Sequence, residues 1–282
     1  MTETVSLVMP VHGGVNPAQF RAAVESVVSQ VRGPDEVVVV ADGPLGETHH
    51  AIIRVLRRSH GCVTVRKFSE NRGAGWANAA GVETAAGTWI AKADADDINL
   101  PPRLETQMAR VHRGDLDLVG SAMGEFEGDP SRIIGVRRPP LSPEGIARRM
   151  RWNNPFNHPT SLYRRDLALE VGNYAGLRYM QDYELFGRMA AAGARMENLE
   201  EVLVLFRADE GAYRRRRARA IHACERTLQM SLRDHGIVST PMMYRNLVLR
   251  SGVRLLPAAG VRAVLRRLLV TAPPEDGRSR DS

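Results

Sequence analysis

The chain has 282 residues, of which 43% are hydrophobic, and it carries a formal net charge of +7. This size and composition suffice for one large α/β domain, alone or with a small appendage. Two distant cysteines, Cys62 and Cys224, exclude a disulfide framework and fit a reducing compartment. The lack of a signal peptide or of any run near ~18–20 apolar residues predicts a cytoplasmic protein, either free or peripheral at the inner face of the cell membrane.

The first half of the chain alternates patterns typical of strands and helices. Apolar runs predict strands at 5–11, 36–40, 63–68 and 88–93, and helical spacing predicts helices between them at 17–31, 48–59 and 74–86. The run 36–40 has no polar alternation, as expected for a strand that is buried on both faces. This order predicts a doubly wound, mostly parallel sheet flanked by helices, with right-handed crossovers.

The second half is less regular. Helices are expected at 101–113, 143–151 and 181–192, and strands at 116–123, 132–136 and 201–206. Basic amphipathic helices follow at 214–232, 241–256 and 261–270, and the polar residues 271–282 are expected to be disordered. We therefore divide the chain into an α/β domain at 1–210, a basic helical extension at 211–270 and a disordered tail at 271–282.

Charge is divided unevenly between these parts. Residues 211–282 hold 15 arginines and 5 acidic residues, a net of +10, whereas residues 1–210 carry a net of −3. A basic tail favours a polyanionic partner, either an anionic membrane surface or nucleic acid. No aromatic side chains are interleaved for base stacking, so we do not expect nucleic acid. A solvated helical face, a helical cap on the domain and a homodimer interface are the alternatives.

An acidic loop follows the strand expected at 88–93. Asp94, Asp96 and Asp97 place three carboxylates within four residues, and these repel one another unless a cation binds them. Alternate carboxylates at a strand end suit a hard divalent ion that also takes phosphate oxygens, whereas a solvated acidic turn is the structural alternative. Asp42 also follows a strand, and ligands bind beyond the carboxyl ends of strands in such sheets. We therefore expect both acidic sites in one crevice.

Three weaker signals follow. Asp182 opens the helix expected at 181–192, where an Asp usually complements the helix dipole or caps the helix but could also act as a general base. The small residues of segment 71–75 would let a ligand approach the backbone before a helix. His158 stands beside a proline in a loop, where a lone His is more often structural than catalytic.

Taken together, these motifs resemble the family 2 glycosyltransferases, which have the GT-A (Rossmann-like) fold. The resemblance covers about residues 4–217 and rests on the order and spacing of the strand at 5–11, Asp42-Gly43-Pro44-Leu45, Asn71-Arg72-Gly73, Asn78-Ala79-Ala80-Gly81, Ala93-Asp94-Ala95-Asp96-Asp97, Asn157-His158-Pro159-Thr160 and Gln181-Asp182-Tyr183-Glu184-Leu185. The Asp-Gly-Pro-Leu segment resembles the branch that contains O-antigen and amylovoran-type exopolysaccharide transferases.

The resemblance implies an inverting transfer from a nucleotide-diphospho-sugar to a glycan or lipid-linked acceptor in cell-surface polysaccharide synthesis. Residues 1–97 would form the nucleotide-sugar half and 98–210 the acceptor half. Asp182 would be the catalytic base, and Asp96 of the DxD motif would bind Mn²⁺ or Mg²⁺ directly. The donor-binding positions would be Pro10, Val11, Asp42, Asn71, Arg72, Gly73, Asn78, Asp94, Ala95 and Asp96. Asn157, His158 and Gln181 would lie on the acceptor side. A lipid-linked acceptor would also suit an interfacial role for residues 214–270.

Two positions depart from the family pattern. Gln181 replaces the Glu that precedes the base, and segment 206–210 has no His to complete a metal shell, so we expect weak or donor-dependent metal binding. Two other functions stay open. One is a nucleotidyltransferase, although its Gly-rich, Lys-bearing phosphate loop is absent after the first strand. The other is a degenerate module that binds a nucleotide sugar without transferring it.

Overall fold

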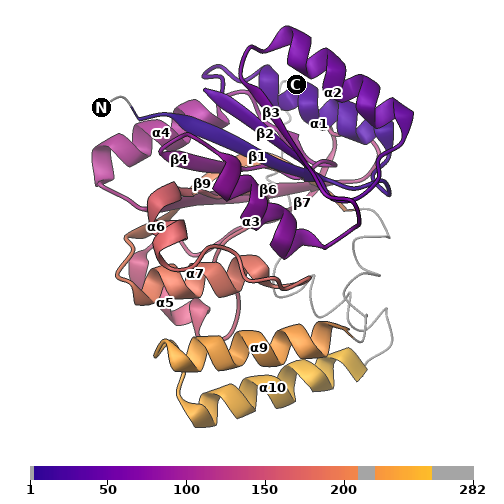
Figure 1. The fold of residues 1–282 in the computed structure, drawn as a ribbon. Helices are drawn as coiled ribbons and strands as arrows, with labels where there is room; N and C mark the ends of the chain where they lie inside the picture. The colour runs from indigo at the N-terminus through magenta and orange to yellow at the C-terminus, as the bar shows by residue number, and fades with distance from the viewer. Residues whose placement is uncertain (1–2, 209–219, 256–282) are drawn as a thin grey trace, which may run out of the picture.

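In the computed structural model, which describes residues 3–208 and 220–255, a nine-stranded sheet forms the centre of the described chain (Figure 1). Its strands are β1 (Val5–Val11), β2 (Glu36–Ala41), β3 (Val63–Lys67), β4 (Trp89–Lys92), β5 (Ile98–Asn99), β6 (Leu118–Phe126), β7 (Ile133–Arg137), β8 (Leu162–Arg164) and β9 (Met196–Arg207). They lie in the order β3-β2-β1-β4-β8-β6-β9-β5, and β7 pairs with β6.

The two halves of the sheet differ in strand direction. β3, β2, β1 and β4 are parallel neighbours, as the alternating pattern of the first half predicts. β8 runs antiparallel to both β4 and β6, whereas β6 and β9 are parallel. β5 and β7 are antiparallel to β9 and β6. The predicted α/β fold is confirmed, although the second half makes the sheet mixed rather than mostly parallel.

Helices cover both faces of the sheet (Figure 1). One face carries α1 (Pro17–Val28), α2 (Glu47–Ser59) and α4 (Arg103–Gly114), and the other carries α3 (Ala74–Thr84), α5 (Pro143–Met150), α6 (Arg165–Glu170) and α7 (Gln181–Ala191). Successive side chains of a strand point to opposite faces, so Leu7 and Met9 pack in the first layer and Val8 in the second. This explains why the strands of the parallel half are apolar throughout.

Local sequence fixes where several helices start and how closely they pack. Asn16 accepts a hydrogen bond from the Ala18 N–H, and Pro17 occupies the first helical position of α1. Ser142 caps α5 in the same way. α3 approaches the sheet closely because Gly81 has no side chain, since a Cβ there would lie 2.3 Å from Val8 Cγ1.

Several elements were not indicated by periodicity. β5, β8, the 3₁₀ helix η1 (His158–Thr160) and α6 contain between two and six residues, which is too short for a periodic pattern to develop. β9 begins at Met196 rather than at 201 because its first residues, Met196 to Leu199, continue the parallel pairing with β6 despite their polar members.

The described part of the basic extension is a pair of helices, α9 (Ala220–Asp234) and α10 (Thr240–Leu255), at the bottom of Figure 1. α9 packs on α7, where Leu228 and Leu232 join the hydrophobic cluster of Leu185. A hydrogen bond of 2.8 Å from Ser231 Oγ to Glu184 Oε1 adds to this contact. Among the described helices none is long and apolar enough to cross a membrane. The predicted helix 261–270, the tail 271–282 and the start of helix 214–232 lie outside the described residues.

Candidate active site

The acidic loop 94–97 follows β4 and contacts the end of β9. Asp94 Oδ1 lies 2.5 Å from Nζ of the buried Lys92. Asp97 is buried, and its Oδ1 accepts a hydrogen bond of 3.0 Å from the Arg207 backbone N–H. Burial raises the pKa of Asp97 well above its usual range, and the charges of Asp94 and Asp96 add to this rise. Arg207 Nε also donates to the Asp96 carbonyl at 3.1 Å. Lys92 and Arg207 thus supply part of the positive charge that this loop requires.

The loop suits a divalent ion that is shared with substrate phosphates. Within residues 3–208 and 220–255, no three Asp, Glu, His or Cys side chains are grouped so that they could hold a metal ion by themselves. Asp97 Oδ2 is buried without a hydrogen-bond partner in the described structure, so this carboxylate points inward. Asp96 and Asp94 are half-buried and remain the two carboxylates in reach of a ligand. Mg²⁺ is usually held by one or two carboxylates together with phosphate oxygens, and the residues fit that pattern.

Asp42, at the end of β2, holds the neighbouring loop. Its buried carboxylate accepts hydrogen bonds from the Arg72 N–H at 2.7 Å, the Gly73 N–H at 3.0 Å and Asn71 Nδ2 at 3.0 Å. Gly43 makes the close approach of this loop feasible: its φ is +91°, and a Cβ there would lie 2.7 Å from the Asn71 nitrogen. Asp42, which the resemblance assigns to donor binding, therefore also holds this loop in place, a structural function that the sequence did not reveal.

Residues 72–75, in the loop that Asp42 holds and at the start of α3, contact other segments of the chain. Arg72 lies over the rings of Phe68 and Trp76, with its Cζ 5.0 Å and 4.7 Å from their centroids. A Cβ on Gly75 would lie 2.3 Å from the Ala175 carbonyl oxygen. The missing side chain at Gly75 thus makes room for the chain's own backbone, not for the ligand that the small residues of segment 71–75 predicted. Asn78 is buried, and its Nδ2 donates to the Ala74 carbonyl at 2.9 Å.

Asp182 lies in the first turn of α7 but does not cap this helix. The N-cap is Met180, whose φ is +63° and whose side chain makes no capping hydrogen bond. Asp182 Oδ2 instead accepts a hydrogen bond of 2.7 Å from Asn154 Nδ2, so the carboxylate faces the loop that follows α5. Asp182 therefore does not cap α7, but its carboxylate lies in the first turn of this helix, as the helix-dipole interpretation predicts, and it lines the pocket described below.

His158 is enclosed by aromatic rings and joins a chain of hydroxyl groups. Its Nε2 lies 2.9 Å from the Tyr174 hydroxyl, which accepts a hydrogen bond of 3.1 Å from the Tyr163 hydroxyl. Burial lowers the pKa of His158, although the charge of Asp182 opposes this shift. These contacts make His158 a structural part of the wall beside Asp182.

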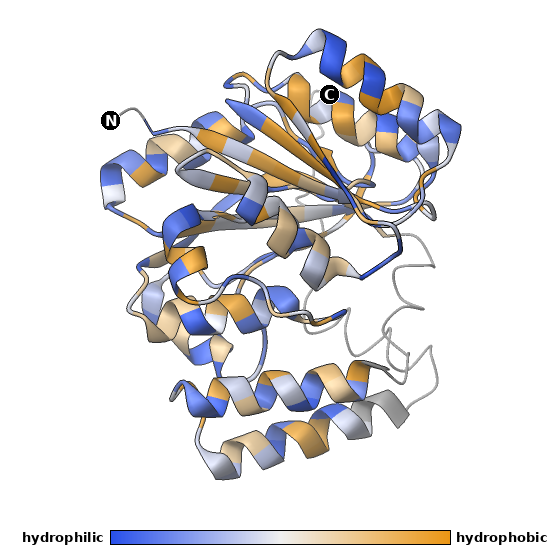
Figure 2. Cartoon of the chain, viewed as in Figure 1, coloured by the Kyte–Doolittle hydropathy of each residue, from blue (hydrophilic) through white to orange (hydrophobic). Residues whose placement is uncertain are grey.

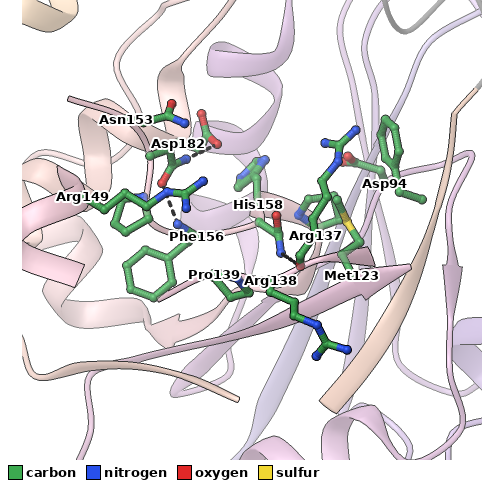
Figure 3. Close-up of a pocket in the computed structure, with 15 residues that line it drawn as sticks. Asp94, Met123, Arg137, Arg138, Pro139, Arg149, Asn153, Phe156, His158 and Asp182 are labelled. Carbon is green, nitrogen blue, oxygen red and sulfur yellow. Dashed lines mark hydrogen bonds between the residues drawn. The ribbon is translucent and has the colours of Figure 1, made fainter. Parts of the chain in front are cut away.

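A pocket of about 260 Å³ brings Asp94 and Asp182 together (Figure 3). In this view Asp182 and Arg149 lie on one side and Asp94 on the other, with His158 between them. The lining residues come from the acidic loop, the ends of β6, β7 and β9, the segment between α5 and η1, and α7: Asp94, Met123, Arg137, Arg138, Pro139, Arg149, Asn153, Asn154, Pro155, Phe156, Asn157, His158, Pro159, Asp182 and Phe206.

The predicted site residues divide into two groups. Asp94, Asp182, Asn157 and His158 line the pocket, with Asn157 Nδ2 also bound to the Ser121 carbonyl at 2.9 Å. The other predicted residues do not line it: Pro10, Val11, Asp42, Asn71, Arg72, Gly73, Asn78, Ala95, Asp96 and Gln181. Most of these lie at the carboxyl edge of the parallel strands, at the end of β1 or in the segments that follow β2, β3 and β4.

Sequence reasoning missed the basic and amide residues of the pocket. Arg137 pairs with the buried Glu125 at 2.5 Å and lies over the Phe206 ring at 4.4 Å. Arg149 ends a helix and Asn153 and Asn154 follow it, yet no spacing in the sequence connects them with Asp182. The one available signal was the polar run Asn153-Asn154 shortly before the motif that contains His158.

Comparisons with known proteins identify the family of this chain. A family model described as "Glycosyl transferase family 2" matches residues 6–172. The chain is 30% identical to the amylovoran biosynthesis glycosyltransferase AmsE of Erwinia amylovora, over 89% of this chain and 94% of that protein. It is 26% identical to the UDP-Gal:alpha-D-GlcNAc-diphosphoundecaprenol beta-1,3-galactosyltransferase of Escherichia coli, over 95% of this chain and 98% of that protein.

The fold is also similar to that of a solved structure, S. aureus TarS 1-349 in complex with UDP. The TM-score is 0.65 at 16% sequence identity, and the match covers 95% of this chain and 75% of that one. The chain spans 43% of full-length TarS. This likeness confirms the GT-A fold that the sequence predicts.

Proposed function

The chain belongs to glycosyl transferase family 2, and on that basis we propose that it moves a sugar from a nucleotide-diphospho-sugar to a hydroxyl of a glycan or lipid-linked acceptor in cell-surface polysaccharide synthesis. The names of AmsE and of the galactosyltransferase, together with the UDP bound by TarS, support this donor and acceptor class. The observation that carries the proposal is the pocket that has Asp94 on one side and Asp182 on the other.

Asp182 is the general base of the proposed reaction. Asn154 binds Oδ2, so Oδ1 takes the proton of the acceptor hydroxyl. The acceptor oxygen bonds to the anomeric carbon while the bond from that carbon to the diphosphate breaks, which inverts the configuration. A positioned base contributes ~10²–10⁴-fold to such a step. His158, fixed by Tyr174, keeps the wall next to this carboxylate in place.

Asp96, with Asp94 beside it, would hold Mn²⁺ or Mg²⁺ together with the donor phosphates. When bound, such an ion neutralises charge on the leaving nucleoside diphosphate. Lys92 and Arg207 already place positive charge around this loop, and segment 206–210 has no His to complete a metal shell. We therefore expect the metal to bind weakly without the donor and more tightly with it.

A donor screen tests the proposed function. Full-length protein is incubated with a panel of nucleotide sugars and decyl-linked acceptors, with Mn²⁺ or with a chelator, and products are identified by mass and by the anomeric NMR signal. Transfer with an inverted configuration is the expected result, with a lower rate in chelator. Nucleotide binding without transfer or hydrolysis of any donor would favour the degenerate module. A product with retained configuration would contradict direct displacement.

We also propose that α10 rests on an anionic membrane surface. Tyr244, Val248 and Leu249 are 61%, 70% and 60% exposed, and their spacing places them on one side of α10, whose apolar residues are visible in Figure 2. The net charge of +10 in residues 211–282 complements anionic lipid. Asn246 Nδ2 donates to the Arg151 carbonyl at 2.8 Å, so α10 also lies against the segment that leads into the pocket wall. A lipid-linked acceptor could thus reach the pocket from the membrane.

A further inference from the structure

The pocket contains a basic side chain that the proposed reaction does not use. Of the three arginines that line it, Arg137 pairs with Glu125 at 2.5 Å and Arg138 lies 3.8 Å from Glu200. Arg149 makes no ion pair with any described residue, and its buried Nε has no hydrogen-bond partner there. Its guanidinium lies over the ring of Trp152, 5.5 Å from Cζ to the centroid.

Partial removal from water raises the free energy of the charged Arg149 guanidinium unless an anion binds to it. Other enclosed arginines of the described chain have partners: Arg188 pairs with Glu184 and Arg250 with Glu225, and the fully buried Arg103 donates to the side-chain oxygens of Asn99 and Gln107. Burial lowers the pKa of Arg149, and no carboxylate among the described residues compensates for this loss of solvation. An unpaired charge that is partly removed from water is stabilised by a bound counter-ion. The planar fork of Arg matches the oxygens of a phosphate group.

The position of Arg149 in the pocket indicates which substrate carries that phosphate. Arg149 and Asn153 lie on the Asp182 side, away from Asp94 (Figure 3). The donor diphosphate is expected at the acidic loop, on the opposite side. The base removes a proton from the acceptor, so groups beside Asp182 contact the acceptor rather than the donor.

We propose that Arg149, together with Asn153, binds a phosphate or diphosphate group of the acceptor. The acceptor is accordingly a sugar linked through phosphate, not a neutral glycan. This inference rests on the proposed function, because it uses Asp182 to define the acceptor side. It assigns to the chain an anion site separate from the one that takes the donor diphosphate.

Calorimetric titration of the full-length protein tests this site. The probes are decyl diphosphate, at concentrations below micelle formation, and UDP. Arg149→Gln should weaken binding of decyl diphosphate by about tenfold or more, since a charged hydrogen-bonded pair is lost, while the affinity for UDP stays within about twofold. Arg149→Lys, which keeps the charge but loses the fork, should fall between wild type and Arg149→Gln.

Arg148→Gln is the matched control, because Arg148 is exposed on the same helical turn and does not line the pocket. It should bind both probes as wild type does, and thermal unfolding of all variants verifies their folding. Three results would overturn the site: no binding of decyl diphosphate by wild type, equal binding by Arg149→Gln, or an equal loss of UDP affinity, which would place Arg149 in the donor site. A wild-type protein that binds decyl diphosphate through Arg149 but transfers no sugar would refute the proposed function while leaving this site intact.

Discussion

Individual carboxylates in this chain have functions that depend on their partners rather than on their residue type. Asp42 binds backbone N–H groups, Asp97 is buried against Arg207, and Asp182 is held by the amide of Asn154. The sequence predicted that Asp94 and Asp182 matter, and the structure places them in one pocket. It could not predict Arg149 or Asn154, because residues of loops and helix ends meet only through tertiary packing and leave no periodic signal.

Asp42→Ala should destabilise the protein, because it removes the acceptor of the Arg72 and Gly73 N–H groups. The Gly73 N–H, which is buried, would then have no hydrogen-bond partner. We expect the free energy of unfolding to fall by roughly 2–4 kcal/mol in urea titrations. Asp166→Ala, at a carboxylate whose side chain is 91% exposed, serves as the control and should change little. If both variants unfold at the same urea concentration as wild type, Asp42 does not anchor the loop.

His158 predicts a pH dependence of stability. Its folded-state pKa is lowered by burial, so the unfolded chain binds the proton first as pH falls. The stability that neutral His158 contributes is fully present above the unfolded pKa of about 6.5 and is lost as pH falls toward the folded pKa. The difference in unfolding free energy between wild type and His158→Gln should therefore shrink from pH 7.5 to pH 5.5. His222→Gln, at an exposed position, is the control, and a difference that grows on acidification would contradict this account.

At the scale of elements, the strands and helices of the first half follow from the sequence because each is long and its apolar pattern is regular. The short elements β5, β8 and η1 form where tertiary contacts override weak local signals. The contact of α3 with the segment at 175–177 is likewise a tertiary contact that the local sequence does not indicate. Gly75 looks like part of a ligand loop in the sequence, whereas its N–H donates to the Leu177 carbonyl at 3.1 Å.

Gly75→Ala should weaken the packing of α3. The new Cβ would lie 2.3 Å from the Ala175 carbonyl oxygen and 2.4 Å from that of Leu177, and backbone atoms cannot turn away as a side chain can. We expect a loss of about 1–3 kcal/mol in the free energy of unfolding, although Ala favours helix more than Gly does. Gly61→Ala adds a Cβ with nothing within 4 Å and should be nearly neutral. Equal stability of the two variants in urea would contradict the close packing at Gly75.

At the scale of the whole molecule, the sequence predicted a GT-A domain followed by basic helices, and the comparisons confirm the family and the fold. It could not predict that β8 enters the sheet antiparallel between β4 and β6, because a three-residue strand gives no sign of its direction. The sequence also did not decide whether the basic helices bind a membrane, cap the domain, form a homodimer interface or face solvent. α9 covers α7, whereas α10 keeps an exposed apolar side.

Replacing Val248 and Leu249 with Asp should abolish the proposed attachment of α10 to membranes. Wild type should float with vesicles of 70% phosphatidylcholine and 30% phosphatidylglycerol, because apolar burial and the basic charge both favour this surface. The double variant should stay at the bottom of the gradient, and Thr227→Asp, at an exposed position of α9, should float as wild type does. Equal flotation of the double variant would show that α10 does not touch the membrane.

The most direct test of the account is the rate of sugar transfer by Asp182→Asn, measured together with its affinity for the donor nucleotide. Asn keeps the shape of the side chain but cannot take the acceptor proton at Oδ1. We predict that the turnover number falls by at least about 10²-fold while the dissociation constant of the nucleotide changes by less than about twofold. Asp166→Asn, at the exposed carboxylate in the first turn of α6, should transfer at the wild-type rate. Transfer by Asp182→Asn at a rate near that of wild type would contradict the account.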